Sequence, residues 1–156
     1  MERKHTYSAR VTWTGNSGSG TSAYQAYTRD HIISVEGKPD IPGSSDPIFL
    51  GNNTRYSPED SLVAALAACH MLWYLHLCAV NNVVVESYVD RVTGVMLENA
   101  DGSGQFSEVT LHPTITVKEK GMMDKAMNLH KDAHYMCFLA RSVNFTIHHK
   151  PQILVS

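Results

Sequence analysis

The chain has 156 residues, with 13 Lys and Arg against 15 Asp and Glu and a formal net charge of −2 at pH 7. This length favours one domain, residues 1–156, large enough to bury a hydrophobic core. The weak charge gives no electrostatic basis for binding nucleic acid or an anionic membrane. Three cysteines, and an N-terminal segment that lacks the apolar stretch of a signal peptide, predict a reducing cytoplasm where thiols are seldom structural disulfides.

The first third of the chain predicts a group of short strands. Residues 5–14 alternate apolar and polar side chains, and residues 22–28 and 31–35 continue in a strand-like pattern. The glycine- and serine-rich residues 15–20 predict a hairpin turn. Residues 37–47 contain three prolines and two glycines, which predicts an irregular loop.

The most apolar stretch, residues 57–80, predicts a long buried helix. Ser57 is suited to cap its first turn, and beyond that turn only His70 and His76 fall outside the apolar set. A helix without a wide polar face is buried in a core or in a membrane. The two histidines and the absence of flanking basic clusters argue against a membrane span. We therefore expect the central helix of a soluble core.

The rest of the chain predicts a second strand group and a second helix. Residues 83–98 and 106–118 read as strands joined by a hairpin loop, residues 125–135 as a helix, and residues 142–155 as a closing strand. Strand groups on both sides of a buried helix predict an α+β fold with antiparallel sheets wrapped around that helix. One thin chain covers so apolar a helix poorly, so we expect a homodimer in which two central helices pack together.

Two of the three cysteines, Cys69 and Cys78, lie on the predicted central helix. Nine residues place them on opposite helix faces with a rise of about 13 Å, whereas a disulfide needs Cα atoms within about 7 Å. Cys78 is therefore predicted to be a small buried hydrophobe. If Cys69 has a redox partner in this chain, Cys137 is the one that remains.

A cysteine in the middle of an apolar helix needs a cation to become reactive. The helix dipole acts mostly in the terminal turns, and an apolar setting disfavours the thiolate. Arginine is the suitable cation because it stays charged when buried, and it needs a carboxylate such as Glu59 to orient it. Ten helical residues separate Glu59 from Cys69 by about 15 Å. Glu59 thus serves Cys69 only through a long intermediary, a helix break or a neighbouring subunit.

Metal binding is the alternative that the second helix suggests. His130, His134 and Cys137 follow at i, i+4 and i+7, which is one helix face if the helix continues that far, and Cys69 could add a fourth ligand. Imidazole and thiolate ligands suit zinc. The remaining histidines of interest are predicted to be structural or surface residues: His70, His76, His112, His148 and His149.

Three features together resemble the OsmC/Ohr family of organic hydroperoxide reductases. They are Ser-Pro-Glu-Asp at residues 57–60, an alanine-rich helix containing Ala68-Cys69-His70, and the late Cys137 before a closing strand. The resemblance covers nearly the whole chain. It implies an intertwined α+β homodimer with active sites at the subunit interface.

The resemblance also implies roles for individual residues. Cys69 would be the peroxidatic cysteine, which reduces an organic hydroperoxide and becomes a sulfenic acid, and Cys137 would resolve it as a Cys69–Cys137 disulfide. An external dithiol of the dihydrolipoamide type would restore both thiols, without a metal or other cofactor. Glu59 matches the glutamate that orients the catalytic arginine, for which we predict Arg29, with Arg55 second.

Two features depart from the family pattern. Phe138 follows Cys137 where the family usually has proline, and no matching motif identifies the catalytic arginine. Trp73 on the central helix is predicted to be a core or dimer contact that also lines an apolar cavity. A non-catalytic member that binds a small apolar ligand between subunits therefore stays an alternative.

Overall fold

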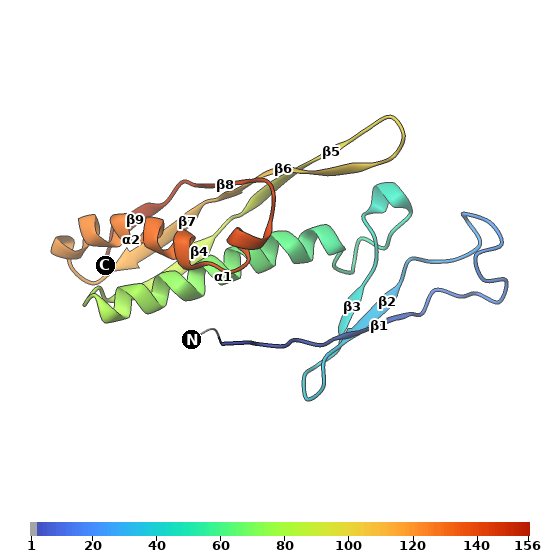
Figure 1. The fold of residues 1–156 in the computed structure, drawn as a ribbon, viewed down its shortest axis with the longest axis horizontal. Coiled ribbons are helices and arrows are strands. Elements are labelled where there is room, and N and C mark those ends of the chain that lie inside the picture. Colours follow the sequence, from blue (N-terminus) through green and yellow to red (C-terminus); the bar gives the residue numbers. More distant parts are fainter. Residues whose placement is uncertain (1–2) are drawn as a thin grey trace. The chain divides into compact units, whose positions relative to one another are not determined.

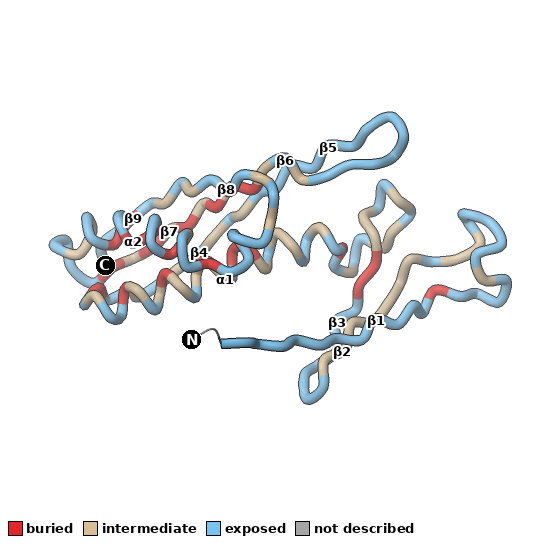
Figure 2. Tube along the Cα trace, viewed as in Figure 1, coloured by how far each residue is buried: buried red, intermediate tan, exposed pale blue. Residues whose placement is uncertain are grey.

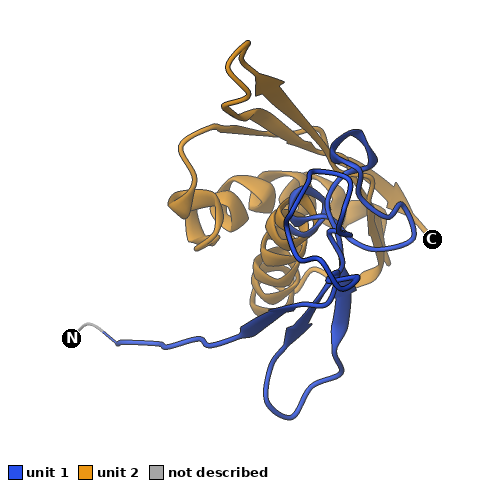
Figure 3. Ribbon diagram, turned by 90° about the vertical axis from the view of Figure 1, so that its right-hand side faces the viewer, with its two compact units in different colours: residues 1–61 blue, residues 62–156 orange. Residues whose placement is uncertain are grey.

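The computed structural model describes residues 3–156 and divides into two compact units (Figure 3). Unit 1 runs to Ser61, and unit 2 comprises residues 62–156. Groups of strands precede and follow each of the two α-helices along the chain. The fold class is α+β, as the sequence predicted.

Unit 1 contains a three-stranded antiparallel sheet in the order β1-β2-β3 (Figure 1). Its strands are β1 (Arg10–Trp13), β2 (His31–Ser34) and β3 (Ile41–Gly43), followed by the short 3-10 helix η1 (Pro47–Phe49). Strand β3 lies in the stretch predicted to be irregular, because an edge strand tolerates a residue such as Pro42 that has no N–H to donate.

The strand predicted at residues 22–28 is wrong. This stretch consists mainly of turns and bends, with one isolated bridge between Asn16 and Tyr27. The cause is local: the Arg29 guanidinium donates hydrogen bonds to the carbonyls of Tyr27 at 2.7 Å and Tyr24 at 2.8 Å. These bonds draw the backbone into a closed loop instead of leaving it free to pair.

The first turn of helix α1 (Pro58–Val80) belongs to unit 1, and the rest belongs to unit 2. The other elements of unit 2 are β4 (Val85–Asp90), β5 (Thr93–Glu98), β6 (Gly104–Leu111), β7 (Pro113–Val117), η2 (Lys120–Met122), α2 (Met123–Met136), η3 (Ala140–Ser142), β8 (Thr146–His149) and β9 (Gln152–Val155). The strands form two sheets, ordered β4-β7-β9 and β5-β6-β8.

The two sheets of unit 2 combine the expected antiparallel pairs with parallel ones. Strands β4 and β7 pair antiparallel, as do β5 and β6, whereas β8 and β9 run parallel to β6 and β7. The long strands predicted at residues 83–98 and 106–118 each break where the chain passes from one sheet to the other. The two breaks are tied together, because the His112 N–H donates to Asp90 Oδ1 at 2.7 Å.

Helix α1 buries one face rather than its whole circumference. Its buried residues recur every three or four positions along one stripe, shown red in Figure 2: Leu66, Ala67, His70, Tyr74 and Cys78. The C-terminal part of this stripe, Tyr74 and Cys78, packs with Ile115 of β7 and Ala133 of α2 in one hydrophobic cluster. On the opposite face Leu72 remains 63% exposed. Helix α1 is long and apolar enough to cross a membrane, a criterion that the core helix of a globular protein also meets.

The start of α1 is fixed by a reciprocal cap. Ser57 Oγ accepts the Asp60 N–H at 3.0 Å, and Asp60 Oδ2 accepts the Ser57 N–H at 3.0 Å. Together these bonds satisfy two backbone donors that a bare helix end would leave unpaired.

We expect Ser57→Ala to lower the free energy of unfolding by about 1 kcal/mol, because the cap oxygen is lost. Ser57→Thr keeps that oxygen and is the matched control. Urea unfolding followed by circular dichroism measures both variants. Equal stability of the alanine and threonine variants would show that the cap contributes nothing.

Candidate active site

The structure brings Cys69 and Cys137 together in unit 2. All three cysteines are free thiols, with Cys69 half-buried on α1 and Cys137 buried directly after α2. The two side chains are close enough that the Cys69 thiol perturbs the titration of Cys137. Cys78 lies in the hydrophobic core, as predicted. The neighbouring thiols are therefore the two that the sequence singles out.

Cys137 is held in place from both sides. Helix α2 ends at Met136, and the Cys137 N–H closes its last turn by donating to the Ala133 carbonyl at 3.0 Å. The chain then turns to an extended conformation, and the Ala140 N–H donates to Cys137 Sγ at 3.4 Å. The thiol position thus depends on the end of α2 and on the start of η3.

The surroundings keep Cys137 and Cys78 protonated at neutral pH. Burial, followed by the neighbouring Cys69 thiol, raises the pKa of Cys137 from 9.0 to about 11, against the opposing effect of the Ala140 N–H. Burial also raises the pKa of Cys78. Because the thiolate is the nucleophile, neither buried group is a ready nucleophile, and Cys69 is the more accessible of the three.

Aromatic side chains stand next to the two thiols. Trp73 lies one helical turn after Cys69, and its ring meets that of Phe138 edge-to-face with centres 5.6 Å apart. The Trp73 ring makes a similar contact with His76 at 5.8 Å. Phe138, the residue that departs from the family pattern, is therefore used as a packing partner, although it remains largely exposed.

The predicted arginines and the glutamate lie in unit 1. The Arg29 guanidinium carbon sits 4.3 Å from the centres of both the Tyr24 and Tyr27 rings. Arg55 forms an ion pair with Asp30, with Nε and Oδ2 3.4 Å apart. Glu59 occupies the first turn of α1, which runs unbroken from Pro58 to Val80. Glu59 and Cys69 are accordingly about 15 Å apart along this helix.

Four histidines of unit 2 gather into what we call the imidazole cluster: His70 from α1, His130 and His134 from α2, and His149 from β8. His70 Nε2 and His130 Nδ1 are hydrogen-bonded at 3.0 Å. The ring centre of His149 lies 4.7 Å from that of His70 and 4.6 Å from that of His134. Tyr74 stacks on His130 at 4.0 Å and closes the inner end of the cluster.

The zinc ligand set considered from the sequence is not assembled among the described residues. Cys137 does not join His130 and His134, because α2 ends before it and its sulfur neighbours Cys69 and the Ala140 N–H. His130 and His134 lie instead with His70 and His149, which the sequence predicts to be ordinary structural or surface histidines. Only the i, i+4 spacing of the α2 pair is visible in the sequence.

Burial keeps the imidazole cluster largely uncharged. Burial, together with the smaller effect of the neighbouring histidines, lowers the pKa of His70 from 6.5 to about 3. Burial likewise lowers the pKa of His130 and of His149 to about 4. At neutral pH these three rings are therefore neutral, and each has one donor and one acceptor nitrogen.

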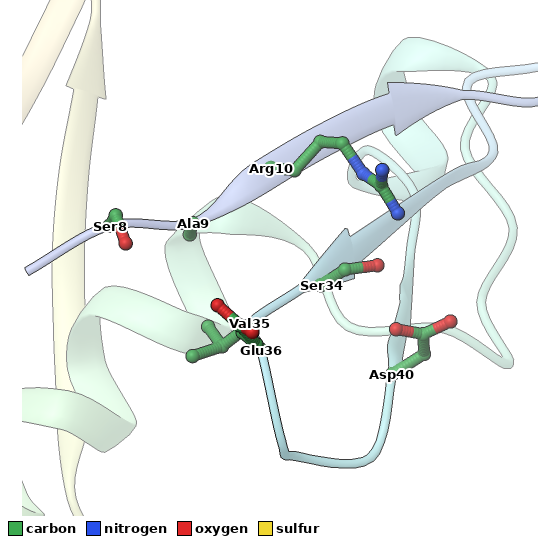
Figure 4. A pocket seen from close by; sticks show the side chains of 7 residues that line it. All are labelled: Ser8, Ala9, Arg10, Ser34, Val35, Glu36 and Asp40. Atoms are coloured by element: carbon green, nitrogen blue, oxygen red, sulfur yellow. The ribbon is translucent and has the colours of Figure 1, made fainter.

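Unit 1 carries a separate open hollow of about 540 Å³ (Figure 4). Its lining consists of Ser8, Ala9, Arg10, Ser34, Val35, Glu36 and Asp40. None of these residues is a cysteine or a histidine, so this hollow is separate from the cysteine pair and the imidazole cluster of unit 2.

Comparison with known proteins identifies relatives over the whole chain. Residues 51–151 match the family model of OsmC-like proteins. An OsmC-like protein of unknown function from Vibrio cholerae is 30% identical, with a TM-score of 0.86 over 95% of this chain and 99% of that one. No curated protein matches.

Two more distant structures share the fold. An organic hydroperoxide resistance protein from Elizabethkingia anophelis is 16% identical, with a TM-score of 0.71 over 100% of both chains. One from Legionella pneumophila is 17% identical, with a TM-score of 0.68 over 97% of this chain and 99% of that one.

The different settings of the thiols predict different alkylation rates. A pKa of about 11 instead of 9.0 makes the thiolate fraction of Cys137 about a hundredfold smaller near neutral pH. We expect N-ethylmaleimide to modify Cys69 first, and the Cys137 rate to rise about tenfold per pH unit until the pH approaches its pKa. Peptide mass spectrometry at several pH values measures both rates. Equal rates for Cys69 and Cys137 near neutral pH would contradict this.

Proposed function

We propose that this chain, which belongs to the family of OsmC-like proteins, is a thiol peroxidase that reduces organic hydroperoxides to alcohols. One observation carries the proposal: the half-buried Cys69 and the buried Cys137 are neighbouring free thiols, although 68 positions separate them in the chain. Such a pair can pass from dithiol to disulfide without large chain movements.

The reaction uses the two thiols in sequence. The Cys69 thiolate attacks the terminal oxygen of the hydroperoxide and the O–O bond breaks. The alkoxide takes up a proton and leaves as an alcohol, and Cys69 becomes a sulfenic acid. The Cys137 sulfur then attacks the Cys69 sulfur, water leaves, and a Cys69–Cys137 disulfide forms. An external dithiol of the dihydrolipoamide type reduces the disulfide by exchange. No metal or other cofactor takes part.

Arg29 is the better candidate for the cation that activates Cys69. Arg55 is already committed to the carboxylate of Asp30. The Arg29 guanidinium is held by two carbonyls and two tyrosine rings, and it forms no ion pair among residues 3–156. The position of the Arg29 guanidinium is thus fixed, and its charge is not neutralised by a carboxylate. Glu59 is proposed to orient the Arg29 guanidinium. Glu59 itself stays about 15 Å from Cys69 along α1.

We propose that the working form is a cytoplasmic homodimer. The face of α1 opposite the core exposes 63% of Leu72 and 60% of Val80. Large apolar side chains in such a row favour burial against another protein surface. A second copy of the same helix face is the partner that the family resemblance implies.

The aromatic side chains beside the thiols support an organic substrate. Trp73 and Phe138 present apolar rings next to the cysteine pair. Contact with the apolar group of an alkyl or aryl hydroperoxide is favourable, whereas hydrogen peroxide gains nothing from these rings. The physical expectation is a preference for cumene hydroperoxide over hydrogen peroxide.

The decisive experiment follows thiols and peroxide together. With dihydrolipoamide present, we expect the wild-type protein to consume cumene hydroperoxide and Cys69→Ser to consume none above the buffer rate. Without the dithiol, Cys137→Ser should consume one hydroperoxide per chain and accumulate a sulfenic acid that dimedone traps. Cys78→Ser is the control and should match the wild type, because this thiol lies in the core. Unchanged thiols after peroxide addition would refute the peroxidase and favour a non-catalytic ligand-binding protein.

A second measurement separates the two arginines. We expect Arg29→Ala to slow the reaction of Cys69 with cumene hydroperoxide by about a hundredfold, the usual cost of removing one charge-stabilising donor. Arg55→Ala should slow it far less, because Arg55 is paired with Asp30. Stopped-flow measurement of one oxidation event isolates this step from reduction by the dithiol. The reverse order of effects would assign the role to Arg55.

A further inference from the structure

The imidazole cluster leaves buried nitrogen atoms without partners. His70 Nδ1, His134 Nδ1 and His149 Nε2 are inaccessible and make no hydrogen bond, and the same holds for His130 Nε2. Each unpaired buried polar atom costs free energy, which a folded chain normally avoids. Four such atoms within one cluster indicate that something absent from the bare chain satisfies them.

The bond between His70 and His130 determines which nitrogens are available. A neutral imidazole has one donor and one acceptor nitrogen, so one ring must donate across the 3.0 Å contact between His70 Nε2 and His130 Nδ1. If His70 Nε2 donates, His70 Nδ1 keeps a free lone pair. This is the usual arrangement of a metal-bound histidine, whose second nitrogen donates to a neighbouring acceptor.

The spacing of His149 from two other rings suits a shared ion. Imidazoles bound to one tetrahedral zinc at about 2.0–2.1 Å have ring centres roughly 5 Å apart. The ring centres of His70 and His134 lie 4.7 Å and 4.6 Å from that of His149. No three His, Cys, Asp or Glu side chains in the described residues already surround a point as metal ligands do. The rings therefore have to turn about their side-chain torsions when an ion enters.

We propose that His70, His134 and His149 form a binding site for a divalent transition metal ion of the zinc class, and that His130 orients His70 for it. Neutral imidazole is a ligand that such ions prefer. His130 is a positioning residue, since it acts through its hydrogen bond to His70.

A cavity of about 470 Å³ adjoins two of the proposed ligands, His134 and His149. Its lining consists of Met127, Asn128, His130, Lys131, His134, His149 and Pro151. Three ligands with an adjoining cavity leave a fourth position for water or a small ligand, as in catalytic rather than structural zinc sites. Lys131 brings a like charge to the cavity wall, so its loss should not weaken metal binding.

The test uses tag-free, full-length protein in which Cys69→Ser and Cys137→Ser remove the neighbouring thiols as ligands. After treatment with a chelator, the protein is titrated with Co²⁺ alone by absorption and with Zn²⁺ alone by calorimetry. We expect one ion per chain and a cobalt spectrum typical of nitrogen and oxygen ligands. Because this background cannot form the proposed disulfide, the result does not depend on the peroxidase.

Substitutions assign the ligands. His134→Gln and His149→Gln should each weaken binding at least as much as His130→Gln, for which about 10–100-fold is expected of an orienting partner. His148→Gln is the matched control for His149→Gln, because the adjacent His148 is exposed and pairs with Glu108. Lys131→Gln should bind as tightly as the parent or more tightly. Circular dichroism verifies that each variant is folded.

Two results would overturn the proposal. The first is the absence of stoichiometric binding of either ion by the chelator-treated protein. The second is binding that His148→Gln weakens as much as His149→Gln does, which would place the ion on the surface histidines. Because His134 and His149 come from different elements, failure of one variant to fold leaves the other to decide.

Discussion

The burial of one face of α1 is the constraint on which the chemistry of this chain depends. Tyr74 is fully buried, stacks on His130 and donates a hydrogen bond to the Ala126 carbonyl at 3.1 Å. This contact fixes the rotation of α1 relative to α2. With that rotation set, His70 points into the core, and Cys69, about 100° around the helix, stands beside it at the edge of the core. Adjacent residues thereby enter different environments.

Helix α2 and the residue that follows it supply the neighbours of both His70 and Cys69. Its inner stripe of Ala126, Leu129 and Ala133 consists of small or medium side chains, which let the helix approach the core closely. His130 and His134 flank this stripe and supply two of the four rings of the imidazole cluster. The helix ends one residue before Cys137, and the change to an extended backbone carries that thiol to Cys69. The end of α2 thus decides that Cys137 serves the thiol pair and not the histidines.

The sequence predicted α1 well because its cap and its apolar composition are local signals, and the observed helix runs from Pro58 to Val80. It did not predict the parallel pairing of β8 with β6 or of β9 with β7. Alternation of apolar residues identifies a strand but carries no information on its partner. The breaks near Asp90 and His112 were missed for a related reason, since the bond that joins them spans 22 positions. The imidazole cluster was missed because its members come from three elements, two of which carry a single relevant histidine.

The separation of thiols from imidazoles has a chemical consequence. A thiolate bound to zinc is a poor nucleophile toward a peroxide. A metal ion shared between the cysteine pair and the imidazole cluster would therefore block the proposed reaction of Cys69. The thiols are also the softer ligands and would attract a zinc-class ion if they faced it. Here the helical twist between Cys69 and His70, together with the end of α2 before Cys137, keeps the sulfur atoms out of the imidazole cluster. A single pair of packed helices therefore keeps the proposed dithiol and the proposed nitrogen-lined ion site apart within one unit.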